Sequence, residues 1–148
     1  MDAPCAADVL FRFIDELDGY PEWMSLTHRV ERLAAEEDGR PAWDVELRAR
    51  IGPFARSKRL RMVRTEHSVP DRSVRFERVE RDGRSHSAWV LAAHVTPVLT
   101  DVGETSQLDM HLHYAGALWT GGVMERVLAD QIVAGRERLL TLVAPRLH

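Results

Sequence analysis

The chain has 148 residues, with 20 basic and 23 acidic side chains and a formal net charge of -3. That length fits one domain, residues 1–148, large enough to bury a sizeable core. The weak negative charge excludes bulk attraction to nucleic acid or anionic lipid, and a single cysteine, Cys5, excludes an intramolecular disulfide and a cysteine-built metal cluster.

The N-terminal region predicts two short helices and no targeting segment. Asp2-Ala3-Pro4 is typical of a helix start, and apolar residues through Leu17 recur on one face of a helix that ends at Asp18-Gly19. Tyr20-Pro21-Glu22-Trp23-Met24 opens a second short helix, because proline fits a first helical turn. The sequence has no signal peptide and no run of the ~20 apolar residues that span a bilayer, so we expect a cytoplasmic protein without membrane insertion.

From Arg29 onward apolar residues alternate with polar ones, a period typical of strands with one buried face. The clearest example is residues 41–51, where Trp43, Val45 and Leu47 alternate with charged residues. Asp82-Gly83 is a hairpin signal. We predict about six strands in antiparallel succession, at residues 28–36, 41–51, 56–66, 73–81, 86–96 and 105–115.

The last segment, residues 118–143, predicts one long amphipathic helix. Its apolar residues recur at steps of three and four, which places them on one broad face, and Pro145 follows its end. Gly135, in its middle, costs about 1 kcal/mol relative to alanine, so we expect close packing there. The fold class is therefore α+β. A sheet that curls around one helix leaves room for a cavity that suits an apolar ligand.

Three stretches of the chain resemble the START-like helix-grip superfamily, which includes polyketide cyclases, lipid-transfer domains and allergen-like carriers. They are Tyr20-Pro21-Glu22-Trp23 after the early helix, Ser87-Ala88-Trp89-Val90-Leu91 in a late strand, and residues 105–116 leading into the final helix. The resemblance covers nearly the whole chain and implies a curved antiparallel sheet wrapped around the C-terminal helix. It implies little about activity, because this fold hosts both carriers and enzymes.

One departure from this pattern concerns the first strand, which in the superfamily precedes the first helix. Only Asp2 and Ala3 precede Pro4, so we expect that strand to be absent and the edges at Leu108 to Tyr114 and Arg29 to Ala34 to be open. Open edges recruit other chains. We therefore expect either a homodimer that fills one edge or a native product that begins further upstream.

Bulky apolar residues and a few polar ones share the inward parity of the strands and the final helix, and they are the candidate ligand contacts. An inward arginine could polarise a carbonyl or hold an acidic head group, and a tyrosine hydroxyl could donate to an enolate. Two simpler explanations stay open: the apolar residues form only the core, and Arg64, Arg78 and Glu80 pair at the rim of the sheet. The candidates are Trp43, Met62, Arg64, Phe76, Trp89, Met110, Tyr114, Met124 and Gln131.

No motif assigns catalytic residues or a cofactor, and we expect none of the latter. Asp109-x-His111-x-His113 places three metal-ligand types on one face of a strand, but its ends are ~13 Å apart, from a rise of ~3.3 Å per residue. We therefore predict surface histidines and no metal site. Nucleotide-binding, serine-hydrolase and zinc-protease fingerprints are missing from the sequence.

Three functions follow from these observations. The first is binding of a hydrophobic or aromatic small molecule, lipid-like or polyketide-like, between the sheet and the C-terminal helix. The second is a polyketide aromatase/cyclase-type enzyme that promotes intramolecular aldol closure and dehydration by holding reacting carbons together. The third is a non-catalytic interaction protein that uses an open sheet edge. Converging polar groups in a cavity favour the enzyme, an apolar chamber favours the carrier, and a groove filled by side chains favours the third.

Overall fold

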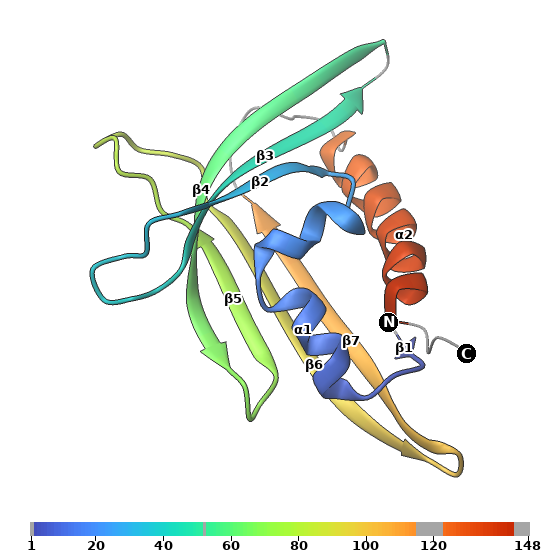
Figure 1. Cartoon of the computed structure of the whole chain (residues 1–148). Coiled ribbons are helices and arrows are strands. Elements are labelled where there is room, and N and C mark those ends of the chain that lie inside the picture. Colours follow the sequence, from blue (N-terminus) through green and yellow to red (C-terminus); the bar gives the residue numbers. More distant parts are fainter. Residues whose placement is uncertain (1, 52, 115–122, 144–148) are drawn as a thin grey trace.

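The computed structural model describes residues 2–51, 53–114 and 123–143, apart from the side chains of residues 49–51, 54, 56, 114 and 123–132. Within these residues, seven strands form one antiparallel sheet that curves beside a long helix (Figure 1). The helices are α1 (Ala7–Ile14), the 3₁₀ helix η1 (Leu17–Glu22) and α2 (Val123–Val143). The strands are β1 (Asp2–Ala3), β2 (Thr27–Leu33), β3 (Ala42–Ile51), β4 (Phe54–Ser68), β5 (Ser73–Arg78), β6 (Trp89–Thr100) and β7 (Gly103–Tyr114).

The strands lie in the order β1-β7-β6-β5-β4-β3-β2, so strands β2 to β7 are neighbours in chain order and β1 crosses to the far edge. Strands β2 to β7 correspond to the six predicted ranges, and the predicted α+β class with a curved sheet and a long C-terminal helix is confirmed. The predicted strand at residues 86–96 begins only at Trp89, because residues 79–88 form a longer connection than the tight hairpin that Asp82-Gly83 indicated.

The predicted start of the chain is wrong, because the first residues form a strand. Residues Asp2–Ala3 make β1, which pairs with Gln107 and Ser106 of β7. Ser106 Oγ also donates to the carbonyl oxygen of Cys5 at a buried position (2.8 Å). Pro4 has no N–H to continue the ladder. The strand therefore stops after two residues, and α1 begins only after a bend.

This short strand changes the description of the sheet edges. The first strand, expected to be absent, is present, but among the described residues it pairs with only two positions of β7. Residues 108–114 of β7 have no described strand on the side away from β6, and β2 forms the opposite edge of the sheet. Dimerisation through either edge stays a prediction.

Three large aromatic side chains, Tyr20, Trp43 and Phe76, form an aromatic cluster that fastens η1 to β3 and β5. Each is completely buried, with ring centroids 5.5 Å apart for Trp43 and Phe76 and 6.2 Å apart for Tyr20 and Phe76. The Tyr20 hydroxyl donates to the carbonyl oxygen of Ile14 (2.8 Å), and burial raises the pKa of this hydroxyl. Trp43 Nε1 donates to Asp18 Oδ2 (3.0 Å). The polar atoms of the cluster are thus hydrogen-bonded, as buried polar groups require.

Helix α2 approaches the end of η1 closely at Gly135. A Cβ atom at this position would lie 2.9 Å from the carbonyl oxygen of Trp23 and 3.4 Å from Cε3 of its ring. Leu139 and Val143, one and two turns later, are buried. The close packing predicted at Gly135 is therefore confirmed, and it fixes where the helix rests on the rest of the fold.

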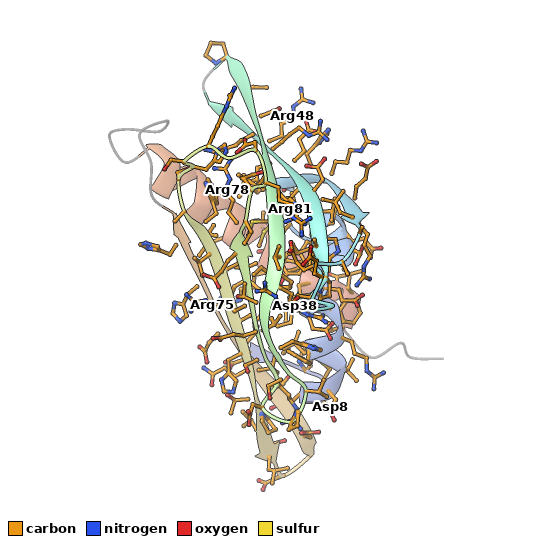
Figure 2. All side chains as sticks on the ribbon, turned by 90° about the vertical axis from the view of Figure 1, so that its left-hand side faces the viewer. Asp8, Asp38, Arg48, Arg75, Arg78 and Arg81 are labelled. Carbon is orange, nitrogen blue, oxygen red and sulfur yellow. The ribbon has the colours of Figure 1, made fainter. Side chains whose placement is uncertain are left out.

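The outer side of the sheet carries ion pairs. Glu36 lies between Arg81 and Arg61, with 2.6 Å from Arg61 Nη1 to Glu36 Oε1, and hydrogen bonds from Arg81 and Arg61 lower the pKa of Glu36. Figure 2 faces this side and shows Arg75 and Arg81 among many charged side chains. The apolar residues of the strands therefore gather on the inner face, next to the helices.

Candidate ligand-binding cavity

A cavity of about 220 Å³ lies between the inner face of the sheet, η1 and α2. Its wall is mostly aliphatic and aromatic. The described side chains from η1 to the start of β2 that line it are Leu17, Tyr20, Trp23, Met24, Leu26 and Thr27. The strands contribute Val45, Leu47, Leu60 and Met62 from β3 and β4, and Trp89, Leu91, Leu108, Met110 and Leu112 from β6 and β7. Helix α2 contributes Arg136 and Leu139.

Strand alternation explains why these side chains meet. In β3, Val45 and Leu47 line the cavity, and Glu46 between them belongs to the opposite face. The register then brings lining residues together across strands, because Val45 pairs with Leu60 in β4. The same holds between β6 and β7, where successive inward residues pair with one another. The main sheet side of the cavity wall thus comes from two pairs of neighbouring strands, β3 with β4 and β6 with β7.

The structure divides the nine predicted ligand contacts into three groups. Met62, Trp89 and Met110 line the cavity. The backbone of Tyr114 pairs with Trp89 at the end of β7, but its side chain lies outside the described residues, as do the side chains of Met124 and Gln131. Ligand contact by these residues stays a prediction.

The third group, Trp43, Phe76 and Arg64, lies outside the described lining of the cavity. Trp43 and Phe76 belong to the aromatic cluster. Arg64 Nη1 donates to the carbonyl oxygen of Asp15 (2.9 Å), and burial lowers the pKa of this arginine. It therefore ties β4 to the end of α1.

The expected pairing at the rim is found for two residues of the three. Arg78 Nε lies 2.9 Å from Glu80 Oε1, whereas Arg64 has the different partner just described. Arg78 also donates to Ser87 Oγ (3.2 Å), which accepts from Lys58 Nζ as well (3.3 Å). Lys58 Nζ lies 5.8 Å from the ring centroid of Trp89, and burial, then Arg78, lowers the pKa of Lys58. Lys58 therefore borders the cavity wall at Trp89, and Ser87 links it to Arg78.

Several lining residues were not among the sequence candidates, chiefly Tyr20, Trp23 and Arg136. Trp23 is the last residue of the Tyr-Pro-Glu-Trp stretch that carried the family resemblance. The short helix predicted there did not show to which side the Trp23 side chain points. Arg136 did carry a signal, because it follows Ile132 by four residues and precedes Leu139 by three, the spacing of the apolar face.

Four of the polar side chains in the described cavity wall fall into two classes. The hydroxyl groups of Tyr20 and Thr27 are engaged within the protein, with Thr27 Oγ1 donating to the carbonyl oxygen of Met24 (2.5 Å). Trp23 is 4% exposed, and its Nε1–H makes no hydrogen bond to a described residue. Arg136 is exposed and forms no ion pair with another described residue. The wall thus offers donors and little acceptor capacity.

The predicted surface histidines lie away from the cavity. Asp109, His111 and His113 are exposed on the outer face of β7, and His94 of β6 pairs opposite Asp109. Over the described ranges, no three side chains of the His, Cys, Asp and Glu types lie close enough together to hold a metal ion. None of the described helices is long and apolar enough to cross a membrane.

Comparison with solved structures identifies this fold. The Zhui aromatase/cyclase from Streptomyces sp. R1128 matches with a TM-score of 0.61 and 14% identity, over 97% of this chain and 89% of that one. A START superfamily protein from Mycobacterium smegmatis gives 0.65 and 14%, over 97% and 92%, and a protein from Thermus thermophilus gives 0.62 and 15%, over 97% and 96%. No protein-family model and no curated protein matches the sequence. The chain has the START-like helix-grip fold, as the resemblance predicted.

Proposed function

We propose that this START-like helix-grip chain binds an apolar small molecule, built around an aromatic ring or a short alkyl chain, in the cavity between the sheet and α2. The supporting observation is an apolar wall around space that the described side chains leave open. An apolar cavity of ~150 Å³ binds benzene. A volume of about 220 Å³ therefore suits a ligand with one or two rings.

A polyketide aromatase/cyclase-type reaction is the second candidate. It is supported by the likeness to one aromatase/cyclase and by the donors of Trp23 and Arg136, which could polarise a carbonyl. Aldol closure also needs a base that removes a proton from carbon. None of the described lining side chains is an aspartate, a glutamate or a histidine. We therefore rank binding above catalysis.

The third candidate is an interaction protein that pairs through a sheet edge. On the side away from β6, residues 108–114 of β7 have no partner strand in the described structure, which supports it. The groove between sheet and helix would then be expected to be filled by side chains, and about 220 Å³ of it is not. Edge pairing and ligand binding are compatible, so we treat a dimer as an addition to the proposed function.

The test uses N-phenyl-1-naphthylamine, a neutral dye that fluoresces in apolar sites. We expect saturable binding to the purified protein. Leu91 lines the cavity, so Leu91→Phe should fill space and weaken binding about tenfold or more, with folding checked by circular dichroism. The matched control is Leu99→Phe, the same exchange at a side chain that is 87% exposed on the β6–β7 hairpin. A dye that does not bind, or that responds equally to both variants, overturns the proposal.

Native mass spectrometry of protein purified without detergent separates the three candidates. A co-purified aromatic or alkyl compound supports binding and supplies a substrate class for turnover assays. Conversion of a poly-β-ketone substrate to a cyclised, dehydrated product would place catalysis first. A dimer whose mass fits two bare chains, combined with no dye binding, would leave the interaction protein as the best candidate.

A further inference from the structure

Two hydrogen-bond donors in the cavity wall have no acceptor among the described residues. Trp23 Nε1–H belongs to a side chain that is 4% exposed. The guanidinium group of Arg136 lines the same cavity from α2. Two other polar groups of the lining, the hydroxyls of Tyr20 and Thr27, already donate to backbone carbonyl oxygens. The two unpaired donors therefore stand out in a wall that is otherwise apolar.

These donors belong to the same part of the wall. α2 comes close to the segment after η1 at Gly135, where a Cβ atom would lie 2.9 Å from the carbonyl oxygen of Trp23. Arg136 is the next residue along the helix. The ring of Trp23 packs against Tyr20, with centroids 4.8 Å apart, and Tyr20 is held by its bond to Ile14. The indole is thus fixed by neighbours that do not need the ligand.

Among the described residues around the cavity, cations outnumber carboxylates. Arg136 lines the cavity, Lys58 borders it at Trp89, and Arg78, which shares Ser87 Oγ with Lys58, is paired with Glu80. The described lining contains no carboxylate to balance Arg136. The cavity is therefore locally positive in a chain whose net charge is -3, which favours an anionic group on the ligand.

We infer, on the basis of the proposed function, that the ligand is an aromatic or short-chain carboxylic acid in its anionic form. Its apolar body fills the cavity, and its carboxylate accepts hydrogen bonds from Trp23 Nε1–H and the Arg136 guanidinium. A buried donor without an acceptor has already lost its hydrogen bonds to water in the folded state. The indole N–H can therefore donate to the carboxylate without a further desolvation cost for the donor. A hydrogen bond between a guanidinium and a carboxylate is charge-assisted and is therefore stronger than one between neutral groups. Trp23 and Arg136 are specificity-determining residues in this assignment.

The experiment compares three competitors that share a naphthalene ring and displace N-phenyl-1-naphthylamine. Naphthalene has no acceptor, 2-acetonaphthone has a neutral acceptor, and 2-naphthoate has an anionic one. We expect affinity to rise in that order, with 2-naphthoate about fivefold or more above naphthalene. The dye itself is neutral and reports cavity binding independently of the carboxylate. Dye binding together with equal affinities for the three competitors would overturn this inference and leave the proposed function standing, whereas no dye binding would overturn both.

Matched variants assign the effect to the two donors. Arg136→Gln should lower the affinity for 2-naphthoate about fivefold, as expected for a largely exposed charge pair, and leave naphthalene unchanged. Arg138→Gln removes the same charge from the same helix at an exposed position outside the described cavity lining, and it should change neither. An equal loss in both variants would mean a general charge effect and overturn the assignment.

A second pair of variants tests the indole. Trp23→Phe should weaken binding of the ketone and the carboxylate relative to naphthalene. Trp89→Phe removes a similar ring area from the same cavity and should weaken all three competitors alike. If both variants weaken the binding of all three competitors by the same factor, the indole N–H of Trp23 has no role in recognition. Should Trp23→Phe unfold, the Arg136 pair still decides, because both of its side chains are exposed.

Discussion

The groove between the sheet and the helices has two halves that share strands and residue types but differ in filling. In β3, Trp43 belongs to the packed aromatic cluster, and Val45, two residues later on the same face, lines the cavity. Between β5 and β6, Phe76 of the cluster pairs with Leu91 of the cavity wall. The boundary thus runs between adjacent residues, so the alternation that builds the inner face does not decide which part is hollow.

What differs is the element opposite each half. The 3₁₀ helix η1 inserts Tyr20 against Phe76 and fills the space completely. α2 packs closely against Trp23 at Gly135, and a space of about 220 Å³ remains between the helix and the sheet. We propose that the packed half supports stability and that the hollow half is the part that serves the proposed binding function. The following variants test that division of roles.

The largest expected effect is on the packed half. Phe76→Ala should lower the free energy of unfolding by about 4 kcal/mol, because a large ring is removed from a close-packed site. Met110→Ala, in the hollow half, should cost clearly less, about 1 to 2 kcal/mol, because Met110 is half-buried and faces open space. Urea unfolding of both variants measures this. Equal losses would show that the two halves are packed alike.

A smaller effect is expected from the polar atom of the cluster. Tyr20→Phe removes the hydroxyl that donates to the carbonyl oxygen of Ile14 and leaves that buried oxygen without this partner. The free energy of unfolding should fall by about 1.5 kcal/mol, measured by urea unfolding at pH 7. Because the ring stays, no cavity is created. An unchanged stability would mean that the hydrogen bond contributes nothing to the packed half.

The close contact between Gly135 of α2 and Trp23 can be altered directly. Gly135→Ala would place a Cβ atom 2.9 Å from a backbone oxygen that cannot rotate away. Overpacking costs about 1 to 3 kcal/mol, and the higher helix propensity of alanine returns about 1 kcal/mol, so we expect a net loss of about 1 kcal/mol by thermal or urea unfolding. Val133→Ala, at a 62% exposed position of the same helix, is the control and should not destabilise. Stabilisation by Gly135→Ala would contradict the close contact.

The smallest effect is expected outside both halves, at Glu36. Its pKa is lowered in the folded state by Arg81 and Arg61, so its contribution to stability is present above the ordinary glutamate pKa, near 4.3, and is lost as the pH falls through the lower folded value. The wild type should therefore be more stable than Glu36→Gln at pH 7, and the difference should shrink below about pH 4. Urea unfolding across this range, with dye affinity unchanged at pH 7, is the measurement. A difference that grows on acidification would contradict the sign.

The sequence was sufficient for the strands of the sheet and for α2, because each repeats a burial period over many residues. It was insufficient for β1, since two residues have no period and form a strand only by pairing with Ser106 and Gln107. Local signals of a helix start at Asp2 were overridden by that distant pairing.

The candidate site was predictable by face and not by position along the groove. Alternation correctly placed Met62, Trp89 and Met110 on the inner face, and it placed Phe76 there too, without showing that η1 fills the space beside it. Trp23 follows the 3₁₀ helix η1, and the direction of its side chain is set by tertiary packing, which the periodicity of the sequence does not report. Arg136 was readable from helical spacing, but a charged residue on an apolar face is usually assigned to the surface.

Strand β1 has a consequence for the order in which the molecule is assembled. The strands from β2 to β7 each pair with the next along the chain, so they can form as hairpins during synthesis. β1 precedes them all, yet its partner is β7, and the bonded residues Cys5 and Ser106 are 101 positions apart. Pairing over such a separation is slow. We expect the N-terminal strand to dock last in folding, with the β1 amides protected after those of β3 and β4 in pulse-labelled hydrogen exchange. Until then, a growing chain would carry the whole edge of β7 exposed.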